Sequence, residues 1–268
     1  MNIVALVKYS LDVAEVKVDP STCEVLTAGV PRRVGNIDKN VVEGAVRLKE
    51  AAEAGTTLRI LSLGPLAARD AFKDVLAMGA DEVILVEDPF GGQAEGGVAV
   101  RLLEAALRHL APIDVIVCGF ASDDGYTHQV PPRLAERLDL PLVASVRSMV
   151  IQGRTLTAEQ DLDDCVQGVS VELPAIVSVD EEAFAPRRTT LLEALKAKQK
   201  PVHIWNAESE LGLALADLEA AVHIVDVKMT GVVVQRRQQV LQGSDMAELA
   251  GRFLDALADT GMITRGAP

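Results

Sequence analysis

Short runs of apolar residues alternate with amphipathic segments through the first half of the chain. Uninterrupted apolar runs of about four to eight residues are typical of strands buried on both faces of a sheet. The segments between them carry apolar residues at helical spacing, as Val41, Ala45 and Leu48 do after Asp38. Repeated strand-then-helix units predict a parallel sheet with right-handed crossovers. The expected strands are 3–7, 58–63, 82–86 and 115–118, and the expected helices are 38–55, 67–78, one ending near 110, and 130–138.

The pattern changes beyond Pro141. Residues 143–152 and 154–161 flank Gly153 as the two arms of a hairpin, and 175–179 reads as a further strand. A short helix rich in lysine is expected at 190–198. The fold class is therefore α/β, a doubly wound, mainly parallel, Rossmann-like sheet with a C-terminal arm. We expect a nucleotide-binding domain at 1–201, with a recognition loop near 184–200, and an arm at 202–268.

Composition and charge narrow the possible functions. Hydrophobic residues make up 49% of the chain but aromatic ones only 3%, so Ala, Val, Leu and Ile must build the core. The formal net charge of -13 opposes binding to nucleic acid or to an anionic lipid surface. No apolar run approaches the roughly 20 residues that span a bilayer. We therefore expect a cytoplasmic protein without stable membrane insertion.

The loop between the expected strand at 115–118 and the expected helix at 130–138 is the most informative stretch. Ligands bind at this position in open parallel sheets. Small and hydroxylated residues beside a helix N-terminus suit a phosphate, and Thr127 adds a hydroxyl group. On the residues alone, the loop predicts either a nucleotide site or an ordinary polar helix entry.

The sequence contains no motif typical of hydrolases, phosphate-loop enzymes or metal sites. There is no Gly-x-Ser-x-Gly elbow and no phosphate loop ending in Gly-Lys-Ser/Thr. The histidines are dispersed, and none has the spacing of a metal ligand pair. We expect no metal site, no catalytic residue and no independent hydrolytic activity.

Several motifs in the same order resemble the electron transfer flavoprotein beta subunit, also known as the FixA family, along most of the chain. The loop at 119–130 aligns with the family's nucleotide-binding loop without a gap. The other matching segments are Leu6-Val7-Lys8, 16–20, Asp38-Lys39-Asn40, Arg47-Leu48-Lys49-Glu50, Ser62-Leu63-Gly64-Pro65, Ala77-Met78-Gly79-Ala80-Asp81, Leu173-Pro174-Ala175, Thr190-Leu191 and Lys196-Ala197-Lys198.

The resemblance implies an electron carrier without catalysis of its own. Members form a heterodimer with an alpha subunit, which holds most of a shared FAD. They accept electrons from acyl-CoA-type or other flavin dehydrogenases and pass them to a quinone reductase or another acceptor. The beta subunit itself holds AMP, or a second FAD in members that bifurcate electrons.

The resemblance also assigns residues to sites. Leu191 takes the place of a leucine that docks on the dehydrogenase, and Lys196, Lys198 and Lys200 would attract an acidic partner surface. Gly35, Asn36, Tyr126 and Pro131 depart from the family pattern, which leaves the choice between AMP and FAD open. The implied nucleotide contacts are Leu6, Gly35, Asn36, Ile37, Asp38, Leu63, Gly119, Ser122, Asp123, Asp124, Gly125, Tyr126, Thr127, His128, Gln129 and Val130.

Two other functions share this sheet and site position. A hydrolase or ligase acting on ATP would need a phosphate-activating lysine or arginine in the loop, and 119–130 contains neither. A nucleotide-sensing stress-type domain would end near residue 150 and would not explain the segment after 202.

Overall fold

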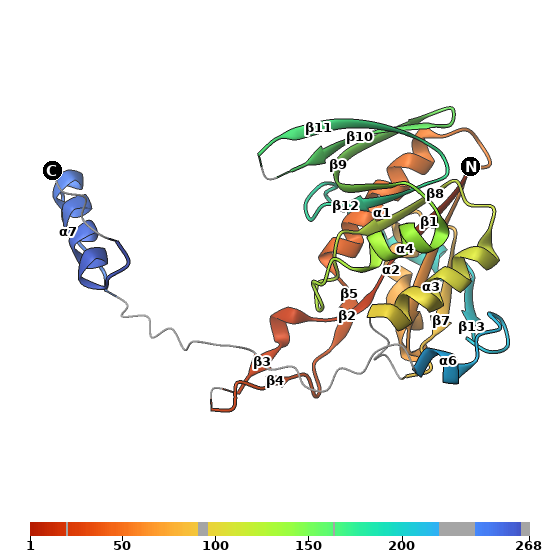
Figure 1. The fold of residues 1–268 in the computed structure, drawn as a ribbon, viewed down its shortest axis with the longest axis horizontal. Coiled ribbons are helices and arrows are strands. Elements are labelled where there is room, and N and C mark those ends of the chain that lie inside the picture. The colour runs from red at the N-terminus through yellow and green to blue at the C-terminus, as the bar shows by residue number, and fades with distance from the viewer. Residues whose placement is uncertain (20, 91–95, 163, 220–238, 264–268) are drawn as a thin grey trace.

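The computed structural model describes residues 1–268 apart from 20, 91–95, 163, 220–238 and 264–268. A nine-stranded sheet in the order β11-β10-β9-β12-β8-β1-β6-β7-β13 forms its centre (Figure 1). Its strands pair in parallel from β9 to β13, and β10 and β11 extend one edge antiparallel. Their bounds are β1 Asn2–Leu6, β6 Thr57–Gly64, β7 Glu82–Glu87, β8 Val115–Gly119, β9 Leu142–Gln152, β10 Thr155–Asp161, β11 Val166–Glu172, β12 Ala175–Val179 and β13 Val202–Trp205.

Helices cover both faces of the sheet, which confirms the predicted doubly wound α/β fold (Figure 1). One face packs against α1, α2 and α5, and the other against α3, α4 and α6. The small ladders β2–β5 and β3–β4 lie between β1 and α1 in the chain. The remaining bounds are β2 Tyr9–Leu11, η1 Val13–Glu15, β3 Lys17–Val18, β4 Val25–Leu26, β5 Arg32–Val34, α1 Asn36–Ala51, η2 Leu66–Phe72, α2 Lys73–Met78, α3 Gly96–Leu110, α4 Val130–Leu138, α5 Leu191–Ala197, α6 Leu215–Glu219 and α7 Met246–Asp259.

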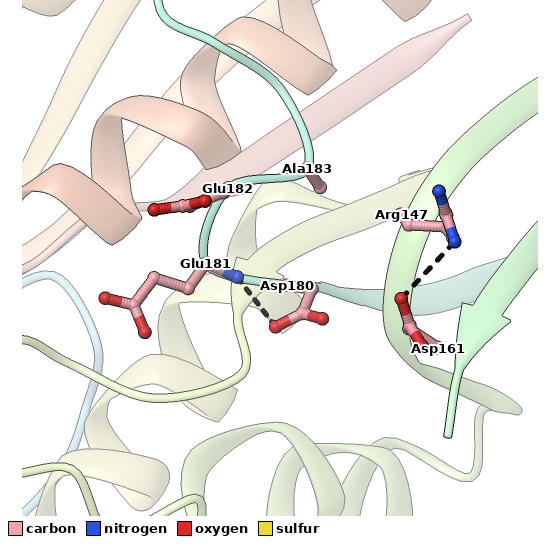
Figure 2. A pocket seen from close by; sticks show the side chains of 6 residues that line it. All are labelled: Arg147, Asp161, Asp180, Glu181, Glu182 and Ala183. Atoms are coloured by element: carbon pink, nitrogen blue, oxygen red, sulfur yellow. Dashed lines mark hydrogen bonds and ion pairs between the residues drawn. The ribbon is translucent and has the colours of Figure 1, made fainter. Parts of the chain in front are cut away.

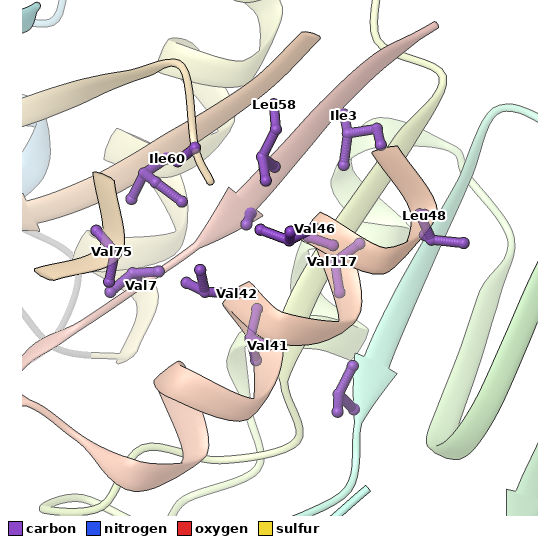
Figure 3. Packing of buried hydrophobic residues seen from close by; sticks show 14 of the residues in the cluster. Ile3, Val7, Val41, Val42, Val46, Leu48, Leu58, Ile60, Val75 and Val117 are labelled. Atoms are coloured by element: carbon purple, nitrogen blue, oxygen red, sulfur yellow. The ribbon is translucent and has the colours of Figure 1, made fainter. Parts of the chain in front are cut away.

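The central strands are buried on both sides, as their uninterrupted apolar runs predict. In β1, Ile3 and Ala5 pack under α1, whereas Val4 and Leu6 pack against α3 and α4. Figure 3 shows the first of these cores, where one face of α1 meets β1, β6 and β8. Because successive side chains of a strand point to opposite faces, each of these central strands contributes to both cores. The sheet is thereby fixed between two helical layers.

Most predicted elements occur where the sequence placed them. The helix at 130–138 has the predicted bounds, and the hairpin arms at 143–152 and 154–161 correspond to β9 and β10. Helix α1 begins at Asn36, earlier than expected, because Gly35 rather than Asp38 is its N-cap. The segment at 67–78 is divided between the 3₁₀ turn η2 and the short helix α2.

Strand β11 was not predicted, although it pairs along its whole length with β10. Val169 and Val171 pack against the core while Ser170 and Glu172 face solvent. This alternation is the pattern of a half-buried edge strand. Its first residues are exposed, so the strand has only a weak signal in the sequence.

Strand β13 lies in the segment from residue 202 onward that the sequence assigned to a C-terminal arm. Val202 to Trp205 pair in parallel with β7, and Ala207 and Leu218 are buried in the second core. These residues belong to the sheet domain because they complete its edge. The later helix α7 has no buried residue. The expected arm lies partly at 220–238 and 264–268, outside the described residues.

Candidate functional site

A cavity of about 420 Å³ opens where the carboxyl ends of β8, β1 and β6 meet. The chain runs from β1 to β6 and β7 on one side, then returns to form β8 on the other side of β1. This is the topological switch point, the place where open α/β sheets bind ligands. The sheet topology therefore makes this cavity the candidate site.

The walls of the cavity differ in polarity. Leu6, Leu61 and Leu63 from the strands, with Ala99 and Leu103 from α3, form an apolar wall. The loop after β8 supplies hydroxyl, amide and imidazole groups, and the described residues of the wall include the basic side chains of Lys8 and Arg133. An apolar wall with a few convergent polar groups is typical of a small-molecule site.

Most of the residues that the resemblance assigned to the nucleotide line this one cavity. They are Leu6, Asp38, Leu63, Gly119, Ser122, Gly125, Thr127, His128, Gln129 and Val130. Gly35, Asn36, Ile37, Asp123, Asp124 and Tyr126 lie beside the cavity and not on its wall.

Asp123 holds the N-terminus of α1 against the loop. Its carboxylate accepts hydrogen bonds from the backbone N–H groups of Asn36, at 2.8 Å, and Ile37, at 3.3 Å. These are orphan donors of the first helical turn, and a carboxylate there also complements the helix dipole. A Cβ atom on Gly35 would lie 2.6 Å from the Asp123 Cγ atom. The departure to glycine at position 35 therefore makes room for the carboxylate.

Asp124 is bound to the segment after β1. Its carboxylate lies 2.7 Å from the Lys8 ammonium and accepts a hydrogen bond from the Leu11 N–H group at 3.2 Å. Burial acts to raise the pKa of Asp124, but Lys8 and the hydrogen bonds from Ser122 and Leu11 together outweigh burial, and the pKa lies below its usual value. The ion pair offsets a negative charge that would otherwise repel a phosphate.

Among the described residues of the cavity wall, Asp38 is the one with an acidic side chain. Its side chain is buried, and Oδ1 accepts a hydrogen bond from the Lys8 N–H group at 2.8 Å. Within the described part of the chain, the buried Oδ2 atom has no hydrogen-bond partner. The pKa of Asp38 is raised to about 7, mainly by burial and also by the neighbouring carboxylates of Asp123 and Asp124, although Lys8 acts to lower it. A ligand hydroxyl or amine group would satisfy this atom.

We expect Asp38→Asn to stabilise the nucleotide-free protein at pH 8 but not at pH 4. The pKa of Asp38 is raised from 3.8 to about 7 in the folded protein. The stability that depends on a neutral Asp38 is therefore fully present below about pH 4, and the wild type loses it as the pH rises through 7 because the buried carboxyl group must ionise. Asparagine stays neutral and avoids this loss. The full shift corresponds to about 4 kcal/mol. Thermal unfolding across this pH range measures the difference in Tm, which should grow to several degrees.

Asp124→Asn is the matched control with the opposite sign. Because the pKa of Asp124 is lowered, its contribution is present at neutral pH and is lost as pH falls. This variant should destabilise the protein at pH 8, with a difference that shrinks toward pH 4. Parallel pH profiles for Asp38→Asn and the wild type would show that Asp38 has an ordinary pKa.

The loop between β8 and α4 has an unusual backbone. Tyr126 and His128 have φ values of 47° and 56°, in the left-handed region that side chains other than glycine rarely adopt. Their rings contact each other at 4.8 Å between centroids, and Phe120 lies 5.5 and 5.0 Å from the two. The three rings hold the loop in this conformation, which turns Thr127 toward the cavity wall. Such strain is found where the surrounding structure fixes a functional loop.

Comparison with known proteins identifies the family. The model of the electron transfer flavoprotein domain matches residues 22–210. The chain is 34% identical over 220 residues to the electron transfer flavoprotein subunit beta of Thermoanaerobacterium thermosaccharolyticum, covering 80% of this chain and 84% of that protein. The chain belongs to the electron transfer flavoprotein beta-subunit family. The resemblance seen in the sequence motifs is confirmed.

Other relatives in this family carry different names. The caffeyl-CoA reductase-Etf complex subunit CarD of Acetobacterium woodii is 30% identical over 214 residues, covering 80% of this chain and 81% of CarD. The protein FixA of Azorhizobium caulinodans is 30% identical over 216 residues, covering 78% of this chain and 76% of FixA. Each match extends over most of both chains. The electron-transfer role of the family therefore applies to this chain.

A second cavity, of about 520 Å³, is a poor candidate for a nucleotide. Figure 2 shows its lining of Asp161, Asp180, Glu181, Glu182, Ala183 and Arg147. Arg147 lies 3.4 Å from Asp161, so its charge is already opposed by one of the carboxylates. The remaining carboxylates would repel the phosphate that defines a nucleotide. Electrostatic repulsion therefore disfavours this second cavity as a nucleotide site and favours the cavity at the switch point.

The segment with the predicted docking residue forms an exposed, well-anchored helix, α5. Leu191, Leu192 and Leu195 are 78%, 61% and 49% exposed. Thr190 and Glu193 cap the helix reciprocally, with the Thr190 N–H group donating to Glu193 at 2.6 Å. Such a capping box fixes the first turn. The helix thus presents an apolar surface from a defined position.

Salt bridges anchor the loop before α5 to α1. The Arg187 guanidinium donates to Glu43 at 2.8 Å and to Glu50 at 2.6 Å. The Phe184 N–H group donates to Asn40 at 3.0 Å, and the Phe184 ring is buried. Lys200 does not face a partner as the sequence suggested. Its ammonium donates to the carbonyl groups that end α2, those of Leu76 at 2.8 Å and Ala80 at 2.6 Å.

The sequence did not point to Lys8, Leu61, Leu103 or Arg133 as cavity residues. Lys8 follows the first strand, and its position after β1 was a usable signal. Arg133 lies in the first turn of α4, where a basic residue reads as an ordinary surface side chain. The spatial approach of α3 to α4 places it at the site, and that approach has no signature in the sequence.

Proposed function

We propose that this chain is the nucleotide-holding beta subunit of a heterodimeric electron transfer flavoprotein. With an alpha subunit it would carry electrons from an acyl-CoA-type or other flavin dehydrogenase to a quinone reductase or another acceptor. Bound FAD, shared between the subunits, supplies the one- and two-electron chemistry. This chain supplies the binding surfaces, and it binds AMP or a second FAD in the cavity at the switch point.

The fit of the cavity to an adenine nucleotide carries this proposal. The leucine-rich wall suits the faces of a planar base, and the unpartnered Asp38 Oδ2 atom suits a ribose hydroxyl or an exocyclic amine. Ser122, Thr127 and the backbone of their loop suit a phosphate. The cavity thus offers a partner for each part of the nucleotide.

Thr127→Val tests the phosphate end of this site. The variant keeps the shape of the side chain but removes the hydroxyl group, and losing a hydrogen bond to a charged oxygen costs roughly 1.5–3 kcal/mol. We expect the dissociation constant for AMP to rise about tenfold to a hundredfold, and the Tm of the nucleotide-loaded protein to fall by linkage. Calorimetric titration and thermal unfolding measure the two effects.

Thr189→Val provides the control, because Thr189 is exposed in the loop before α5 and does not line the cavity. It should leave both AMP affinity and Tm unchanged. An unchanged AMP affinity in Thr127→Val would remove this residue from the phosphate site.

The C-terminal segment supports pairing with an alpha subunit. Helix α7 is amphipathic and has no buried residue, and Phe253 and Leu254 on it are 55% and 51% exposed. Apolar side chains of this size are normally covered in an assembled protein. We propose that the residues of 202–268 that follow the sheet domain form an arm, and that this arm packs on the alpha subunit.

The exposed face of α5 supports docking of a separate dehydrogenase. Leu191, at the start of the helix, is its most exposed apolar residue, and Lys196 and Lys198 are exposed at its C-terminal end. Exposed leucines on a helix that also carries charged residues suit a transient interface with an apolar anchor and a polar rim. CarD is named as part of a complex with a CoA-ester reductase. This agrees with a flavin dehydrogenase acting on CoA esters as the partner of the present chain.

A further inference from the structure

Helix α4 lacks most of the backbone donors that a helix N-terminus usually offers to a phosphate. Its first turn contains Pro131 and Pro132, which have no N–H group. The Arg133 N–H group already donates to the Gln129 carbonyl at 3.2 Å. Only the N–H group of Val130 remains within this turn. The usual mode of anion binding by amide donors is therefore largely absent at α4.

The same turn carries a guanidinium group on the cavity wall. Arg133 and Gln129 both line the cavity, beside the start of α3. A Cβ atom on Gly96 would lie 4.0 Å from Arg133 Nη1 and 3.8 Å from Gln129 Oε1. Arg133 thus extends from α4 across to the first residue of α3.

The two basic side chains described on this wall, Lys8 and Arg133, differ in their ion pairing. Lys8, the other basic residue of the cavity, lies 2.7 Å from Asp124. In the part of the chain that the structure describes, no carboxylate pairs with the Arg133 guanidinium. An arginine in a cavity that holds a buried, unpartnered carboxyl oxygen on Asp38 indicates a ligand with both a donor group and an anionic group. A nucleotide has both.

We propose that Arg133 binds the phosphate of the nucleotide and replaces the amide donors that Pro131 and Pro132 remove. The guanidinium offers parallel N–H donors that match phosphate oxygens and remains charged at all physiological pH values. Arg133 then determines selectivity for a phosphorylated ligand over the bare nucleoside. This inference rests on the proposed nucleotide site and adds the residue that recognises the charge.

Titration of the full-length, nucleotide-free chain with AMP and with adenosine tests this role. We expect Arg133→Gln to weaken AMP binding about tenfold to a hundredfold, which is the usual range for a charge-assisted hydrogen bond. Adenosine affinity should stay within about twofold of the wild type, because its base and ribose contacts are elsewhere in the cavity. Arg133→Lys should restore part of the AMP affinity, since it keeps the charge and loses the planar fork.

Arg137→Gln is the matched control, because Arg137 lies one turn further along α4, pairs with Glu104 and does not line the cavity. It should leave both affinities unchanged. Unchanged AMP binding in Arg133→Gln would overturn the inference, as would an equal loss for AMP and adenosine, which would mean a structural role. A wild-type chain that binds neither compound would instead contradict the proposed function itself.

Discussion

Leu191→Ala is expected to slow electron transfer from the physiological dehydrogenase by roughly thirtyfold or more, because truncating an interface hot spot costs at least about 2 kcal/mol. The side chain is 78% exposed, so its removal costs the fold of the chain very little. The loss is measured as a decrease in kcat/KM for the dehydrogenase with this protein as the electron acceptor. We expect it to affect only electron transfer between the two proteins. Heterodimer assembly, nucleotide content and chemical reduction by dithionite should remain as in the wild type.

Leu66→Ala serves as the control for this experiment, because Leu66 is a 52% exposed leucine in η2, outside α5. It should leave coupling to the dehydrogenase unchanged. Normal coupling in Leu191→Ala would remove α5 from the docking surface. Loss of heterodimer assembly would place Leu191 in the interface with the alpha subunit.

The anchoring of α5 explains why a single leucine can have such an effect. Arg187 joins the preceding loop to Glu43 and Glu50 of α1, and its hydrogen bonds hold the pKa of Glu43 below the usual value although burial acts to raise it. Lys200 joins the end of α5 to α2. A helix held at both ends presents its leucines without a large ordering cost on binding.

The sequence predicted the sheet because its central strands are uninterrupted apolar runs. Residues 3–7 and 115–118 have no polar alternation, and both are buried on two faces in the structure. Strand β11 was missed because its outward face is polar and its first residues are exposed. Strand β13 was assigned to an arm since a short edge strand after a lysine-rich segment has little pattern of its own.

The candidate site could be located from the sequence, but the direction of its side chains could not. The loop after β8 was predicted from its place between a buried strand and a helix. Asp123 and Asp124 are neighbours in this loop, yet one caps α1 and the other pairs with Lys8. Those contacts join residues more than 80 positions apart in the chain, with separations of 87 and 116. Local sequence patterns carry no information about such pairs.

The isolated chain is expected to retain almost no FAD, whereas co-expression with an alpha subunit should give a yellow heterodimer. The proposed function places most flavin contacts on the alpha subunit. The cavity of about 420 Å³ at the switch point is the site proposed here for the nucleotide that belongs to this chain alone. Flavin absorbance of the two preparations, at equal protein concentration, measures the difference. This contrast is the largest that we expect, because it concerns retention or loss of a cofactor.

Extraction and counting of the nucleotides in the purified heterodimer tests the central claim most directly. We predict an FAD that depends on the alpha subunit, together with one further adenine nucleotide held by this chain. AMP as that second nucleotide would indicate a simple carrier, and a second FAD would allow electron bifurcation. A single flavin retained in full by this chain alone, with no other nucleotide in the heterodimer, would contradict the account.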